Sequence, residues 1–130
     1  MEGQLTVGSV GEKREAVTPE NTAIQYGSGC VPVYATPAMI GLMEGAAVEA
    51  VAAQLPAGMA TVGTELKVRH MAATPVGLNV RATAELIEVD GRRLVFSVAA
   101  FDDKEQIGSG THERFMIHVE KFLAKAAAKK

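Results

Sequence analysis

The sequence of 130 residues contains one cysteine and no tryptophan. Because Cys30 stands alone, an intramolecular disulfide framework and a zinc site built from several thiolates are both excluded. An excess of one charge is also lacking, since 13 Lys and Arg face 15 Asp and Glu, which gives a net charge of −2. This balance argues against a nucleic-acid-binding surface. No basic segment with an apolar run opens the chain, so we expect no signal peptide and a cytoplasmic location.

Hydrophobic residues, in contrast, make up 48% of the chain. A chain of this length and composition can bury a core, and we expect one domain over residues 1–130. The Ala- and Lys-rich segment 124–130 is predicted to fray into solvent.

The longest apolar stretch, residues 37–55, is predicted to be one helix. Thr36 before Pro37 is typical of a helix start, because the threonine hydroxyl can cap free N–H groups and proline suits the first turn. The few strongly polar residues inside the stretch point in different directions around a helix: Glu44, Glu49 and Gln54. The two carboxylates argue against a membrane span. A helix apolar on nearly all sides must be surrounded, and a carboxylate inside it is costly unless it is paired or used. Glu44 is therefore the first candidate for a functional site.

The rest of the chain is predicted to consist mainly of strands and turns. Residues 5–25 are predicted to form an irregular strand pair, and the Gly-containing segment 26–33 a loop. Four further strands are expected at residues 61–73, 78–89, 93–102 and 106–122, with Asp90-Gly91 as a hairpin turn. This order favours an α+β fold in which an antiparallel sheet curls around the helix, over a helix laid on a flat sheet. Small helix residues, including Gly41, Gly45 and Ala46, would permit close contact between backbones.

Alternation in residues 66–70 directs His70 toward the helix. A lone inward histidine is more often a core residue than a catalyst. Together with Glu44 in the helix, however, a catalytic role for His70 becomes as well supported as a structural one. Such a pair can serve as a general base or as an activated nucleophile. Thr36 lies eight residues before Glu44, about 12 Å along a straight helix, so the two cannot touch within it. Either the chain folds back at Thr36, or a substrate bridges the two residues, or a second subunit supplies one of them.

Other polar positions allow two interpretations each. Gly63 can present a backbone N–H to a substrate oxygen, or it can mark a strand bulge. Arg114 can bind an anion, although its local sequence favours a surface ion pair. His112 and His118 lack metal-ligand spacing, so we expect no metal site.

Five runs of the sequence, at residues 34–36, 41–44, 70–75, 88–94 and 107–114, together resemble the hotdog-fold thioesterases, and most closely the fluoroacetyl-CoA thioesterases. The resemblance covers about residues 34–122. It implies a hotdog fold, with an antiparallel sheet wrapped around one long helix, and a homodimer that can assemble further. It also implies that Thr36, Glu44 and His70 are catalytic, that the Gly63 N–H receives the thioester carbonyl, and that Arg114 lies in the substrate site.

The resemblance predicts an enzyme that hydrolyses short-chain acyl-CoA to free acid and CoA, with coenzyme A as part of the substrate and no separate cofactor. Those fluoroacetyl enzymes carry a longer lid with a phenylalanine, whereas residues 26–33 are short and contain none. Two alternatives are a hotdog enoyl-CoA hydratase and a non-catalytic acyl-CoA binding module. The hydratase usually needs an Asp/His pair that we do not find, and the module needs no Thr/Glu/His set.

Overall fold

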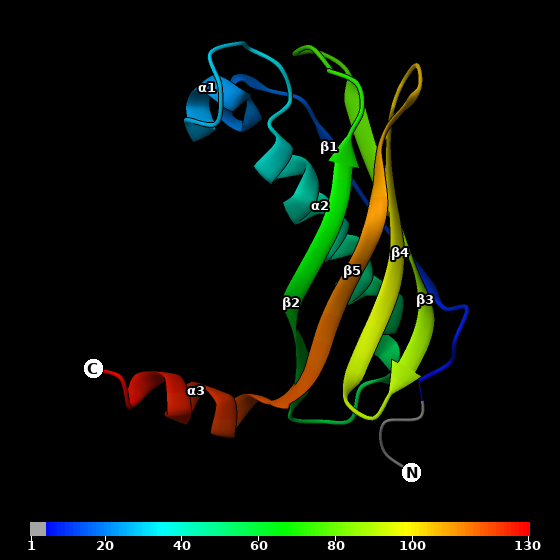
Figure 1. Cartoon of the computed structure of the whole chain (residues 1–130), viewed down its shortest axis with the longest axis vertical. Coiled ribbons are helices and arrows are strands. Elements are labelled where there is room, and N and C mark those ends of the chain that lie inside the picture. Colours follow the sequence, from blue (N-terminus) through cyan, green and yellow to red (C-terminus); the bar gives the residue numbers. More distant parts are fainter. Residues whose placement is uncertain (1–4) are drawn as a thin grey trace.

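A computed structural model describes residues 5–130 as one antiparallel sheet curved around a long helix (Figure 1). In chain order the elements are β1 (Val10–Ala16), the 3-10 helix η1 (Pro19–Asn21), α1 (Ala23–Tyr26), α2 (Thr36–Val51), the 3-10 helix η2 (Ala52–Gln54), β2 (Met59–His70), β3 (Asn79–Asp90), β4 (Arg93–Asp102), β5 (Gln106–His118) and α3 (Val119–Ala127). The strand order is β1-β3-β4-β5-β2, and every neighbouring pair is antiparallel. The predicted α+β architecture is confirmed.

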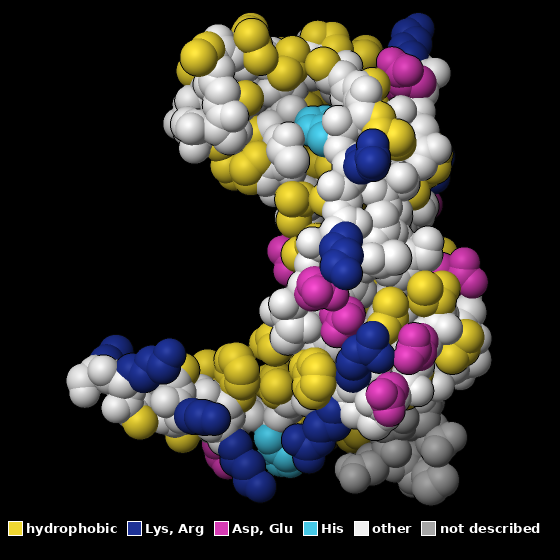
Figure 2. Space-filling model, in the orientation of Figure 1, with side chains coloured by type: hydrophobic (Ala, Val, Ile, Leu, Met, Phe, Trp, Pro, Cys, Tyr) yellow, Lys and Arg dark blue, Asp and Glu magenta, His cyan; other side chains and the backbone are white. Residues whose placement is uncertain are grey.

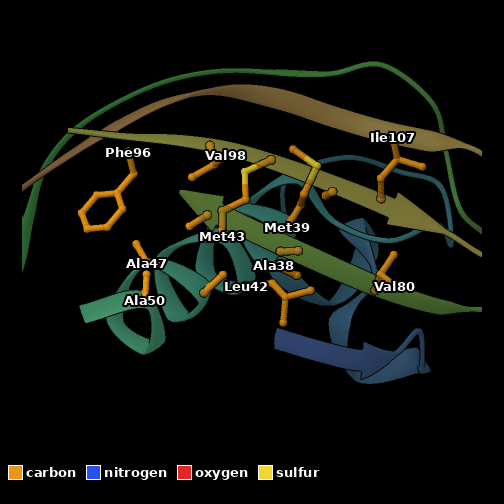
Figure 3. Packing of buried hydrophobic residues seen from close by; sticks show 14 of the residues in the cluster. Ala38, Met39, Leu42, Met43, Ala47, Ala50, Val80, Phe96, Val98 and Ile107 are labelled. Carbon is orange, nitrogen blue, oxygen red and sulfur yellow. The ribbon is translucent and has the colours of Figure 1, made fainter. Parts of the chain in front are cut away.

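The predicted central helix is present as α2, continued by η2. Its sheet-facing side carries the buried residues Ala38, Met39, Leu42, Met43, Ala46, Ala47, Ala50 and Val51. Figure 3 shows Met39 and Met43 reaching from α2 toward Val98 and Ile107. The opposite side of α2 is exposed at Gly41 and Val48, so the sheet covers the helix on one side only. The sequence predicted an apolar helix that is covered on all sides. Within a single chain, part of the surface of α2 stays exposed.

Strand β1 comes close to the backbone of α2 at Gly11. A Cβ at Gly11 would overlap the backbone of Ala46 and Ala50, so the strand can approach α2 only because this residue has no side chain. Gly41, which was expected to permit such an approach, has open space at its Cβ position. The close approach therefore depends on a strand glycine against helix alanines.

Two predicted segments differ from the structure. Residues 5–25 contain one strand, β1, and not a strand pair, because Pro19 and a capping box between Thr18 and Asn21 form the turn η1 instead. The last strand was expected to reach Phe122 but ends at His118. From Val119 the apolar residues recur at helical spacing among good helix formers, and the chain forms α3.

Helix α3 projects away from the body of the molecule (Figure 1). Its large apolar side chains are exposed, with Val119 at 36%, Phe122 at 42% and Leu123 at 59%. Figure 2 shows apolar side chains where α3 leaves the body, facing the hollow between α3 and the opposite end of the molecule. Residues 124–130, expected to fray, are exposed, and 124–127 complete this helix. Among residues 5–130, no helix is long and apolar enough to cross a membrane.

The contact at Gly11 leads to a stability prediction. Gly11→Ala should lower the free energy of unfolding by about 1–3 kcal/mol or more, because the added methyl group must displace α2 backbone. Val10→Ala on the exposed side of the same strand is the control and should change it by no more than about 0.5 kcal/mol. Urea unfolding of both variants measures this. Equal stability of Gly11→Ala and wild type would contradict the close packing.

Candidate active site

The first residue of α2, Thr36, meets the last residue of β2, His70. The Thr36 Oγ1 lies 2.7 Å from the His70 Nδ1. Ala35, and not Thr36, is the N-cap residue, and no side chain caps the helix. The prediction that the Thr36 hydroxyl caps the helix is therefore wrong: that hydroxyl is engaged with an imidazole.

His70 points inward, as the strand alternation predicted. Its Nε2 is buried and has no hydrogen-bond partner within the described residues. Burial lowers the pKa of His70 from its ordinary value. Burial therefore favours the neutral imidazole, and a neutral imidazole beside a hydroxyl can accept its proton.

A cavity of about 310 Å³ opens beside this pair. It is lined by Ala23, Ser28, Gly29, Val31, Val33, Tyr34, Thr36, His70, Met71, Ala72 and Ala73. The segment after α1 is a loop, as predicted, and its apolar contribution to the cavity comes from Val31 and Val33. The Tyr34 hydroxyl donates a hydrogen bond to Glu15 at 2.5 Å, and its burial raises the pKa of Tyr34 far above the ordinary value. Tyr34 therefore lines the cavity with an uncharged side chain that is held in place by Glu15.

A second cluster forms around Arg114 of β5. Its side chain is buried, and its NH1 lies 3.3 Å from the Glu44 Oε2. Its Nε and NH2 donate to the hydroxyl and the carbonyl of Thr61 at 2.8 and 2.9 Å. The surface location favoured by the local sequence is wrong. Burial lowers the pKa of Arg114 and Glu44 raises it, but arginine remains charged at any ordinary pH.

His112, which sequence reasoning did not select, completes this cluster. It is 1% exposed, its Nε2 lies 3.1 Å from the Arg114 NH1, and its Nδ1 lies 2.9 Å from the Glu65 carbonyl oxygen. Burial lowers the pKa of His112. A signal for it existed in the sequence, because strand alternation places His112, Arg114 and Met116 on one face of β5.

Gly63 lies against the same cluster. A Cβ there would come within 2.5 Å of the Glu44 Oε2, so any side chain would push the carboxylate away. The strand register also shifts between Gly63 and Glu65, which is a β-bulge. The predicted bulge is present, and the same residue faces the candidate site.

The structure therefore brings the predicted residues together in two groups. Thr36 and His70 form one, and Glu44, Gly63 and Arg114 form the other with His112. Because α2 is continuous from Thr36 to Val51, the chain does not fold back to join them, which removes one of the three expected arrangements. Within residues 5–130 no group of three or more His, Cys, Asp or Glu is placed to hold a metal ion.

Comparison with known proteins identifies the family. Residues 17–120 match the model of the fluoroacetyl-CoA-specific thioesterases. The chain belongs to this family. The fluoroacetyl-CoA thioesterase of Streptantibioticus cattleyicolor is 55% identical over 97 residues, which are 75% of this chain and 70% of that protein.

Solved structures agree. The fluoroacetyl-CoA thioesterase FlK is 45% identical, with a TM-score of 0.90 over 97% of this chain and 98% of that one. A thioesterase superfamily member from Thermus thermophilus is 27% identical, with a TM-score of 0.89 over 97% of this chain and 93% of that one. The resemblance, the hotdog fold and the acyl-CoA thioester hydrolase activity that the sequence predicted are confirmed.

Proposed function

We propose that this thioesterase hydrolyses short-chain acyl-CoA and that Thr36, Glu44 and His70 carry the reaction. The observation that supports this most directly is the 2.7 Å contact between the Thr36 hydroxyl and the half-buried imidazole of His70, at the wall of a cavity of about 310 Å³. A cavity of this size suits a short acyl group with its thioester. Coenzyme A enters as part of the substrate, and the reaction needs no separate cofactor.

In this proposal His70 removes a proton from the Thr36 hydroxyl, or from a water that Thr36 holds. The activated oxygen adds to the thioester carbonyl, the C–S bond breaks, and CoA leaves as the thiol with the proton that His70 took up. If Thr36 is the attacking group, a water then hydrolyses the acyl-Thr36 ester, which releases the free acid and restores the hydroxyl. Glu44 serves as the second base or as an alternative nucleophile, oriented by Arg114. The Gly63 N–H receives the carbonyl oxygen. A covalent acyl-enzyme on Thr36 or Glu44, trapped by rapid quench and found by mass spectrometry, separates nucleophilic attack by a residue from direct attack by water.

The reaction is tested by release of free thiol from acetyl- to hexanoyl-CoA. We expect turnover by wild type, a loss of about 10²-fold or more for Glu44→Gln, and a comparable loss for His70→Ala. Glu49→Gln, which removes an exposed carboxylate from the same helix, is the control, and its turnover should stay near that of wild type.

Absence of thiol release across the panel would favour the binding module. Hydration of an enoyl-CoA without thiol release would favour the hydratase. A folded Glu44→Gln variant with near-wild-type turnover would make Glu44 a structural residue.

We also propose a homodimer with its active sites at the interface. Strand β2 forms one edge of the sheet, so its outer hydrogen-bonding groups can pair with a second copy. The side of α2 that the sheet leaves uncovered and the apolar side of α3 offer further surface to the same partner. In such a dimer the Thr36–His70 pair of one chain faces the Glu44 cluster of the other, which accounts for their separation of about 12 Å within one chain.

The dimer should sediment at about twice 13.6 kDa. A sharper test mixes two inactive variants, Glu44→Gln and His70→Ala, after dissociation and reassociation. A shared site leaves each heterodimer with one intact site, so about one quarter of wild-type activity should return at random pairing. Each variant reassociated alone is the control. A fully active monomer, or a mixture without recovery, would refute the shared site.

The loop over the cavity makes a strong preference for the fluorinated substrate unexpected. Its cover consists of a Gly-containing backbone with Val31 and Val33, and Val31 is 54% exposed. A small substituent changes binding by only about 1–3 kcal/mol in a well-formed apolar pocket. This loop therefore gives weak discrimination.

Acetyl-CoA and fluoroacetyl-CoA should thus be hydrolysed with kcat/KM values within about a hundredfold of each other. The uncatalysed hydrolysis of the two thioesters is the reference, because fluorine raises the intrinsic reactivity. A fluoroacetyl preference of many thousandfold would show that residues 26–35, including the fixed Tyr34, form an effective gate.

The remaining expectations concern the setting of the enzyme. We infer a cytoplasmic location, which the free and exposed Cys30 supports because thiols persist in a reducing compartment. The net charge of −2 gives no support to a nucleic-acid partner.

A further inference from the structure

The hydrogen bonds of His112 fix its tautomer. A carbonyl oxygen can only accept, so the Nδ1 that lies 2.9 Å from the Glu65 carbonyl carries the proton and donates it. The Nε2 lies 3.1 Å from the Arg114 NH1, which can only donate, so the Nε2 carries no proton and accepts. Both contacts are satisfied only by the neutral imidazole with its proton on Nδ1.

This imidazole connects two parts of the candidate site. The Glu65 carbonyl lies just beyond the bulge that begins at Gly63, and a Cβ at Gly63 would come within 3.2 Å of the His112 ring. On its other side, His112 shares the Arg114 NH1 with the Glu44 carboxylate. One side chain thus holds both the bulge that presents Gly63 and the guanidinium that orients Glu44.

We propose that His112 is a positioning residue for the thioesterase reaction and acts only as the neutral Nδ1–H tautomer. The proposal rests on the proposed roles of Glu44 and Gly63. If the Nε2 were protonated, the N–H of the resulting imidazolium would face an N–H of Arg114. Two donors on two cations would then repel each other, with no acceptor between them. Arg114 would then lose an acceptor, and its hold on Glu44 would shift.

The groups around His112 act in both directions, and the net effect lowers its pKa. The hydrogen bond to the Glu65 carbonyl on β2 and the Glu44 carboxylate on α2 raise the pKa of His112, whereas the Arg114 cation on β5 lowers it. The Phe96 ring on β4, whose centroid is 6.3 Å away, carries no charge. Burial is the largest influence and also favours the neutral ring. Loss of activity through His112 is therefore expected on the acid side.

Three variants test the proposal. The substitution His112→Gln keeps a donor and an acceptor but gives a side chain that cannot be protonated, whereas His112→Phe fills the space and offers neither. We expect His112→Phe to lower kcat by about 10²-fold, the scale of a misplaced catalytic group, and His112→Gln to recover most of that loss. His118→Gln, at an exposed histidine, is the control.

The pH profile separates positioning from mere packing. In wild type His70 and His112 must be neutral and Glu44 must be ionised, so three protonations inactivate the enzyme and the acid limb of kcat/KM should have a limiting slope of about 3. In His112→Gln the slope should fall by about one, and in His118→Gln it should stay as in wild type. An unchanged slope in His112→Gln, or wild-type kcat in His112→Phe, would overturn the proposal. If His112→Phe does not fold, the slope in His112→Gln decides alone.

Nitrogen-15 NMR of the imidazoles tests the same idea without turnover. The proposal requires a protonated Nδ1 and an unprotonated Nε2 in His112, and a raised His112 pKa in Arg114→Met, where the neighbouring cation is gone. A proton on Nε2, or an unchanged pKa, would overturn it. Failure of wild type to release thiol, with the NMR result as expected, would instead count against the proposed roles of Glu44 and Gly63.

Discussion

The buried guanidinium of Arg114 is the group on which the candidate site depends. A buried charge is tolerated only when its donors are satisfied, and Arg114 meets this condition with Thr61, His112 and Glu44. The contact with Arg114 in turn limits the position or the charge state of each partner. Thr61 fixes the start of β2 against β5, His112 must be neutral, and Glu44 is held in a helix that otherwise packs apolar side chains. Gly63 must lack a side chain because the carboxylate occupies that space.

The geometry of α2 determines how the chemistry is divided. A regular helix separates residues eight positions apart by about 12 Å, so Thr36 and Glu44 cannot form one compact triad within a chain. The protein instead forms a hydroxyl–imidazole pair at the helix start and a carboxylate–guanidinium cluster near its middle. Both groups use β2, with His70 at its end and Gly63 at its bulge. The open edge of the same strand is where a second chain would bring the two groups together.

The cavity beside Thr36 and His70 is the place proposed for the acyl group. One wall is rigid, because Tyr34 is buried and bonded to Glu15. The opposite cover is a loop with only two valines at the cavity. In the proposed reaction the acyl group thus meets the least constrained part of this site, whereas the proposed hydrolytic groups lie on the helix and the strands.

The parts of the fold that could be predicted from the sequence are those that depend on interactions between neighbouring residues. Helix α2, the strands β2 to β4 and the turn at Asp90-Gly91 depend on periodicity and turn chemistry, which neighbouring residues specify, and they were predicted closely. Of the strand pair expected before α1 only one strand, β1, is present, and the helix after His118 was missed because short apolar segments fit strand and helix patterns alike. The site residues were predicted mainly from the resemblance to the thioesterases. The local sequence alone predicted that Arg114 lies at the surface and that Thr36 caps the helix.

The sequence by itself determined which side chains face the core, because alternation and helical period are local. It thereby selected Glu44 and His70, and it contained the signal for His112. Only the tertiary structure decided what these groups touch. Thr36 meets His70 because the start of α2 packs on the end of β2, and Arg114 reaches Glu44 across seventy residues of chain. The tautomer of His112 likewise follows from a carbonyl on another strand. Partners so distant in sequence are fixed by packing of the sheet on the helix, which no local pattern contains.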